Sequence, residues 1–111
     1  MSSRRIIKIN KLVRQQLAEI MNKELSLKPG ILITIAKVDT SHDLRYTRVS
    51  VSVFPEGETN YAMQTLKKEL PKLQRYLFGK LHMKPSPVLV FLVDRTEVEA
   101  DKVEKILKGL F

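Results

Sequence analysis

Cysteine is absent from the 111-residue chain, and glycine occurs only four times. Without cysteine, the chain has neither a disulfide framework nor a zinc site built on thiolates. Its glycines do not form the phosphate-binding loop of nucleotide enzymes. No apolar run approaches the roughly 20 residues of a membrane helix, and the segment MSSRRIIKINK lacks the apolar core of a secretory signal. We therefore expect a cytoplasmic protein with no membrane partner.

Side chains that carry out catalysis or bind metals are equally scarce. The chain has two histidines, and only His42 has an acidic neighbour, Asp43. We find no serine in the setting of a nucleophile and no paired carboxylates, and two histidines without thiols do not make a metal site. We interpret His42 as a surface turn residue and Asp94 as a cap or turn acceptor. We expect no enzymatic activity, metal, cofactor or small-molecule substrate.

Acidic residues are few relative to basic ones, and the imbalance is uneven along the chain. There are 12 acidic and 20 basic residues, so the net charge is +8. Residues 1–25 carry six basic and two acidic side chains, and residues 71–84 carry four basic and none acidic. Residues 85–111 carry four basic and five acidic side chains. This distribution favours a polyanionic partner, and the alternative is that the charge serves solubility alone.

Residue periodicity predicts a mixture of helices and strands. Apolar residues recur every three or four positions in the helical segments, and β-branched residues are frequent in the strands. The predicted helices cover residues 5–25, 55–70, 71–83 and 97–110, the strands cover 31–38, 45–54 and 88–93, and polar turns occupy 39–44 and 84–87. This order predicts an α+β fold with helices packed on one face of a three-stranded sheet.

The predicted strands differ in the solvent exposure that their sequences indicate. In residues 45–54, three valines alternate with Arg48 and two serines, so one face of this strand should meet water. The strand is close enough to residues 31–38 to form an antiparallel hairpin. The run VLVFLV at 88–93 is apolar at every position, which predicts burial on both faces and a central part in the core.

A proline interrupts an otherwise continuous leucine stripe. Leucines recur at helical spacing from Leu66 to Leu81, and Pro71 stands in the middle. Helix interiors normally reject proline, whereas the first turn tolerates it. We therefore interpret Pro71 as the start of a second helix whose free N–H groups favour a phosphate, with Lys72 and Arg75 in its first turn. The alternative is a solvated helix face beside a chance proline.

The candidate RNA contacts are basic residues on the first helix, on the open sheet face and along the kinked segment. They are Arg5, Lys8, Lys11, Arg14, Arg48, Lys72, Arg75, Lys80 and Lys84, with Pro71 as the kink. Arginine and lysine contacts to phosphate position a protein without reading base sequence. The residues themselves leave two classes open: a basic domain that binds RNA, and a protein-binding module whose charge serves solubility.

Two segments resemble the ribosome-binding factor A family. ITIAKVDTSHDLRYTRVSVSVF is similar to the hairpin of that family, and VLVFLVDRTEVEADKVEKIL is similar to its later strand and closing helix. With the basic amphipathic first helix, the resemblance covers nearly the whole chain. Two departures stand out. Glu69, Leu70 and Pro71 occupy the kink, where the family has a small residue, any residue and glycine, and Thr47 stands where alanine is usual.

The resemblance implies a fold and a function. The fold would be a single type-II KH-like domain over residues 1–111, with the order α-β-β-α-kink-α-β-α. The function would be that of a non-enzymatic assembly factor, monomeric in solution, that binds the immature small (30S) ribosomal subunit and its 16S rRNA late in maturation and supports growth in the cold. The alternative is a generic KH-like RNA-binding or protein-interaction module that is not dedicated to ribosome assembly.

Overall fold

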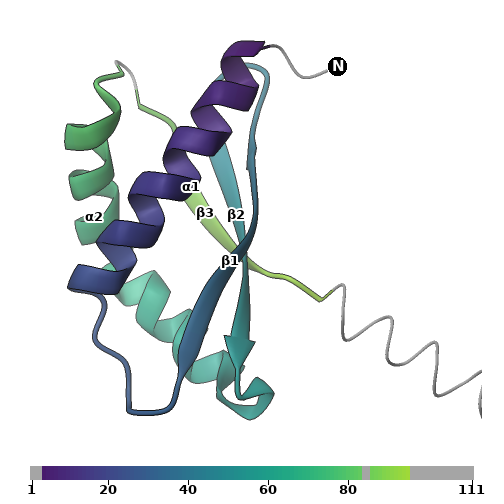
Figure 1. The fold of residues 1–111 in the computed structure, drawn as a ribbon, viewed down its shortest axis with the longest axis vertical. Coiled ribbons are helices and arrows are strands. Elements are labelled where there is room, and N and C mark those ends of the chain that lie inside the picture. Colours follow the sequence, from purple (N-terminus) through teal and green to yellow (C-terminus); the bar gives the residue numbers. More distant parts are fainter. Residues whose placement is uncertain (1–3, 84–85, 96–111) are drawn as a thin grey trace, which may run out of the picture.

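A computed structural model describes residues 4–83 and 86–95 (Figure 1). Its elements are the helix α1 (Arg4–Glu24), the strands β1 (Leu32–Thr40) and β2 (Tyr46–Phe54), the 3-10 helix η1 (Glu56–Glu58), the helix α2 (Thr59–Leu81) and the strand β3 (Val88–Val93). Both long helices lie on one face of the sheet (Figure 1). The predicted α+β class is therefore confirmed. The predicted helix 97–110 lies outside the described residues.

The three strands form one sheet in the order β1-β2-β3. The predicted hairpin is confirmed, because β1 and β2 pair antiparallel with Leu32 opposite Phe54 and Thr40 opposite Thr47. β3 pairs with β2 in parallel, so the helix α2 forms the crossover between them. The central strand is therefore β2, and both other strands are at an edge within the described part of the chain.

The hairpin turn is shorter than predicted, because β1 continues to Thr40. The backbone N–H of Tyr46 donates to the Ser41 hydroxyl, and that hydroxyl donates to Asp43 Oδ1 over 2.6 Å. The N–H of Arg45 donates to the same carboxylate oxygen over 3.1 Å. The Ser41 hydroxyl, followed by the Arg45 N–H, lowers the pKa of Asp43 from its ordinary value. Polar side chains thus satisfy the backbone of this turn, as the sequence suggested.

The expectation that the strand 88–93 is buried on both faces is wrong. In β3, Leu89 is buried, whereas Val88 is 49% exposed and Leu92 is 43% exposed. The physical reason is that the helices cover only one face of the sheet, so alternate side chains of each strand point away from the core. The core position belongs to β2, where Val49 and Val51 are fully buried.

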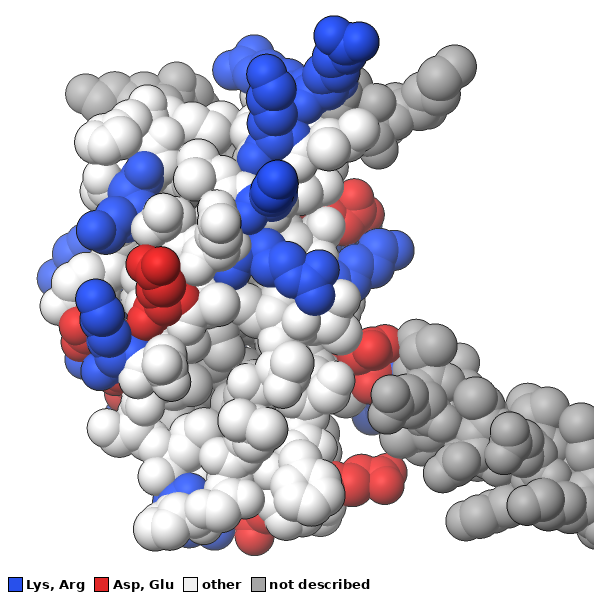
Figure 2. All heavy atoms as spheres, viewed as in Figure 1, with Lys and Arg blue, Asp and Glu red and all other residues white. Residues whose placement is uncertain are grey.

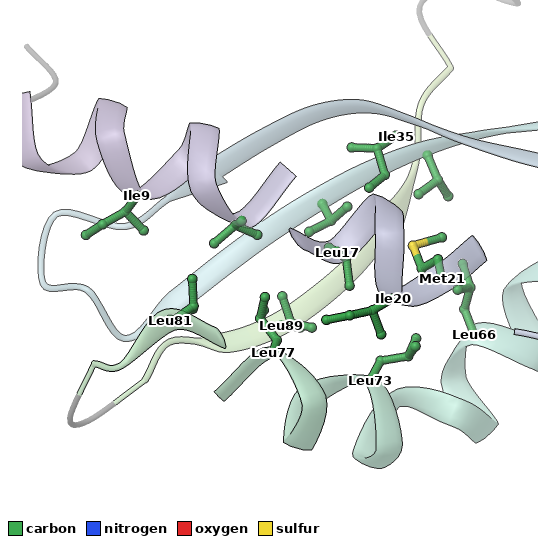
Figure 3. Packing of buried hydrophobic residues seen from close by; sticks show 13 residues of the cluster. Ile9, Leu17, Ile20, Met21, Ile35, Leu66, Leu73, Leu77, Leu81 and Leu89 are labelled. Carbon is green, nitrogen blue, oxygen red and sulfur yellow. The ribbon is translucent and has the colours of Figure 1, made fainter. Parts of the chain in front are cut away.

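The core lies between the two helices and the covered sheet face (Figure 3). Both helices contribute stripes at steps of three and four residues, as their sequences predicted. The buried cluster consists of Ile9, Val13, Leu17, Ile20, Met21, Ile35, Val49, Val51, Leu66, Leu73, Leu77, Leu81 and Leu89. The apolar positions predicted for the first helix and for the leucine stripe therefore face the core.

The prediction that Pro71 starts a second helix is also wrong. Helix α2 is continuous from Thr59 to Leu81, with Pro71 inside it. An interior proline costs about 3 kcal/mol or more, but Leu66 and Leu73 on either side are fully buried, and burying each leucine stabilises by about 1.5–3 kcal/mol. The packed stripe therefore outweighs the lost hydrogen bond. Figure 1 shows α2 changing direction along its length, so the helix bends without opening a second N-terminus.

A buried hydroxyl pair accounts for the threonine that departs from the family pattern. Thr40 and Thr47 lie opposite each other across β1 and β2. Their Oγ1 atoms are 3.0 Å apart and hydrogen-bonded, and both residues are buried. Each hydroxyl is therefore the polar partner of the other in a site that excludes water.

Thr47→Ala should lower the free energy of unfolding by about 1–3 kcal/mol, because it leaves the buried Thr40 hydroxyl without this partner. The double variant Thr40→Val/Thr47→Val removes both hydroxyls and keeps the side-chain shape, so it should be more stable than Thr47→Ala. Urea denaturation followed by circular dichroism measures both. An unchanged midpoint for Thr47→Ala would show that the pair contributes nothing.

Candidate nucleic-acid interface

The outward face of α1 carries the largest run of basic side chains. Arg4, Arg5, Lys8, Lys11 and Arg14 are exposed, and residues 4–18 contain no acidic side chain. The buried positions of α1 face the sheet and α2, so Arg4, Lys8 and Lys11, at spacings of four and three, follow one another along the solvent side. Figure 2 shows Lys and Arg side chains gathered over the first half of this helix. This arrangement produces a local positive potential that attracts polyanions.

The second half of α2 packs antiparallel beside α1. At one end, Glu24 of α1 pairs with Lys72 of α2, with 3.4 Å between Oε2 and Nζ. At the other end, Ile9 and Leu81 both belong to the core cluster, and Figure 3 shows them at the same end of it. Lys80, which precedes Leu81, therefore lies at the end of the molecule that carries the basic half of α1.

The three α2 residues predicted to share an RNA backbone do not share one helix face. Lys72 and Arg75 are three positions apart and lie on one side of α2. Lys80 is five positions beyond Arg75, which corresponds to about 140° around a helix. Lys72 is also engaged in the ion pair with Glu24. Lys80 thus lies toward the end of α2 near the start of α1, and Lys72 and Arg75 lie together near the proline.

Arg14 has a structural contact that its sequence position did not reveal. Its Nη2 donates to the carbonyl oxygens of Ile35 over 3.0 Å and Ala36 over 3.3 Å. The register of β1 against β2 is irregular between Ile35 and Lys37, which is a β-bulge that turns a carbonyl away from the ladder. Arg14 therefore holds α1 to β1, in addition to its predicted role in the long-range attraction of RNA.

Arg14→Ala should lower the free energy of unfolding by about 1–2 kcal/mol, because two carbonyls lose a charged donor at a half-exposed site. Arg14→Lys should recover only part of this loss, since an ammonium lacks the planar fork that reaches both oxygens. Thermal melting compares the two variants with Lys11→Ala, which removes an exposed charge from the same helix. Equal melting temperatures for all three would contradict the assigned contact.

Gln74 is a residue whose importance sequence reasoning missed. Its Nε2 donates to the carbonyl of Pro87 over 3.0 Å, and its Oε1 accepts from the N–H of Leu89 over 2.7 Å. The side-chain amide thus takes the place of a neighbouring strand at the outer edge of β3, and it ties α2 to the sheet. A glutamine at a half-buried helix position has no sequence signal for such a partner.

The remaining candidates lie elsewhere. Arg48 is exposed on the sheet face opposite the helices, between Asp39 of β1 and Val90 of β3 in the register. It shares this face with Tyr46, which is 50% exposed. Lys84 lies outside the described residues. The predicted contacts are thus divided between a helical face and an open sheet face.

Metal-binding clusters and membrane-spanning helices are absent from residues 4–83 and 86–95. No three His, Asp or Glu side chains in these ranges come together in a way that would hold a metal ion. Neither long helix in the described part of the chain is apolar enough over a sufficient length to cross a membrane.

The chain matches known sequences over nearly its full length. A family model described as Ribosome-binding factor A matches residues 5–107. Ribosome-binding factor A of Bdellovibrio bacteriovorus is 30% identical over 108 residues, which cover 96% of this chain and 81% of the relative.

Solved structures share the fold as well. The crystal structure of ribosome-binding factor A from Thermus thermophilus is 26% identical with a TM-score of 0.69, over 82% of this chain and 97% of that one. A Thermus thermophilus RbfA homology model, fitted into the cryo-EM map of a 30S-RBFA complex, is 28% identical with a TM-score of 0.63, over 75% and 88%. The expected KH-like fold is thereby confirmed, and the chain belongs to the ribosome-binding factor A family.

Proposed function

We propose that this protein is a non-enzymatic assembly factor that binds the small (30S) ribosomal subunit and contacts its 16S rRNA late in maturation. The observation that carries this proposal is the basic face of α1, where residues 4–18 include five cations and no acidic side chain. Family membership and similarity to the Thermus protein in a 30S-RBFA complex support it. We place this activity in the cytoplasm and expect the protein to act as a monomer and to matter most for growth in the cold.

The chemistry of the proposed contact is phosphate binding. Exposed Lys and Arg side chains neutralise phosphates and release condensed counterions, which favours binding and makes it depend on salt. Arg4, Lys8 and Lys11 lie about 6 and 4.5 Å apart along the helix axis, because each residue rises about 1.5 Å. One face of α1 can therefore follow an RNA backbone over several phosphates. Such contacts fix the position of the protein and leave the base sequence unread.

This proposal is tested by cosedimentation of the protein with separated ribosomal subunits from the organism that encodes it. The protein should be enriched on free small subunits over large subunits and complete ribosomes, and it should dissociate as salt rises. Equal recovery in the soluble fraction at low salt would contradict the proposal. Binding to small subunits that does not change with salt would instead favour a protein-interaction module.

A further inference from the structure

The ion pair between the two long helices joins a carboxylate to a candidate RNA contact. Glu24 is the last residue of α1, and its Oε2 lies 3.4 Å from Lys72 Nζ, at the middle of α2. The side chains of Lys72 and Glu24 are 40% and 31% exposed. The pair is therefore accessible from solvent, and exposed pairs of this kind are weak.

Lys72 lies at the centre of a row of cations. Lys68, Lys72 and Arg75 occupy positions i, i+4 and i+7 of α2, which lie on one side of a helix. Lys68 and Arg75 are exposed. Glu24 thus covers the middle of this row and leaves both ends free.

The position of Glu24 on its own helix is electrostatically unfavourable. The C-terminal end of a helix carries partial negative charge from its unpaired carbonyls, and it prefers a cation. Lys72 offsets this repulsion in the free protein. Displacement of Glu24 from Lys72 by another anion would therefore cost little free energy, because the Glu24 side chain can turn toward water.

We propose that the Glu24 carboxylate occupies the position beside Lys72 that an RNA phosphate takes in the complex. RNA binding then replaces the carboxylate with that phosphate. The inference rests on the proposed RNA-binding function. A phosphate at this position interacts with Lys68 and Arg75 as well as with Lys72, whereas the Glu24 carboxylate pairs with Lys72. Glu24 is then a specificity-determining residue. It weakens binding to any polyanion that cannot place a phosphate at the centre of the row.

The test compares the variants Glu24→Gln and Glu19→Gln. The affinity of each variant for transcribed 16S rRNA is measured across a potassium chloride titration. Both variants remove one negative charge from α1, and Glu19 is exposed and forms none of the ion pairs in the described part of the chain. Glu24→Gln should bind about two- to five-fold more tightly than Glu19→Gln, which corresponds to the weak pair that it releases. Its salt dependence should be steeper by about one phosphate contact.

Lys72→Gln supplies the second half of the test. Added to Glu24→Gln, it should abolish the gain in affinity, and alone it should weaken binding less than it does in the Glu24→Gln background. Thermal melting of each variant checks that the fold is kept. Equal affinities for Glu24→Gln and Glu19→Gln would overturn the exchange while leaving RNA binding intact. If the parent protein itself does not bind 16S rRNA, the proposed function and the exchange both fail.

Discussion

Val49→Asp is expected to abolish the cooperative unfolding transition. Val49 is fully buried at the centre of β2, opposite Val38 of β1 and Phe91 of β3. An unpaired carboxylate placed there would cost several kcal/mol, against a total stability of about 5–15 kcal/mol for a domain of this kind. Circular dichroism during heating should show a weak, broad change in place of a sharp transition.

Val90→Asp is the matched control, because it places the same side chain on the edge strand. Val90 is half-buried and lies beside Arg48 in the parallel register, on the sheet face away from the helices. Water and the guanidinium can both reach the new carboxylate, so the expected loss is about 1–2 kcal/mol. If Val90→Asp proved as damaging as Val49→Asp, β3 would have to be buried on both faces, contrary to the packing of the helices on one face of the sheet.

Lys8→Gln/Lys11→Gln is expected to weaken binding to 16S rRNA roughly ten-fold at moderate salt and to lower the slope of log affinity against log salt by about two. Both side chains are exposed on the solvent side of α1, so melting should hardly change. Because phosphate contacts do not read bases, the loss should be similar for many RNA sequences. Fluorescence anisotropy with labelled RNA across a salt titration measures both quantities.

Lys23→Gln/Lys37→Gln removes the same charge from other places and serves as the control. Lys23 lies in the last turn of α1, and Lys37 is exposed on β1. This variant should show a smaller change in affinity and in salt slope. Equal losses from both double variants would mean that net charge, and not the basic half of α1, determines binding. A changed sequence preference with unchanged affinity would contradict the assigned role of Lys8 and Lys11.

Within residues 4–83 and 86–95, local periodicity predicted α1 and the three strands, but the sequence analysis divided α2 into two helices at Pro71. The stripe from Ile6 to Leu25 predicted α1 almost to its ends, and the alternation around Arg48 predicted which side of β2 meets water. The family resemblance was also readable from the hairpin residues. These features depend on neighbours a few positions away, so the order of side chains along one helix or strand contains the information.

Only the tertiary structure decided which elements and side chains meet. A fully apolar strand fits the centre or the edge of a sheet, and the parallel pairing of β2 with β3 placed it at the edge. Arg14 donates to the carbonyl oxygen of Ile35, 21 positions away in the sequence, and Gln74 donates to that of Pro87, 13 positions away. Helix α2 continues through Pro71 because buried leucines on both sides hold it in place. The physical reason is that such contacts depend on the packing of whole elements, which no local spacing encodes.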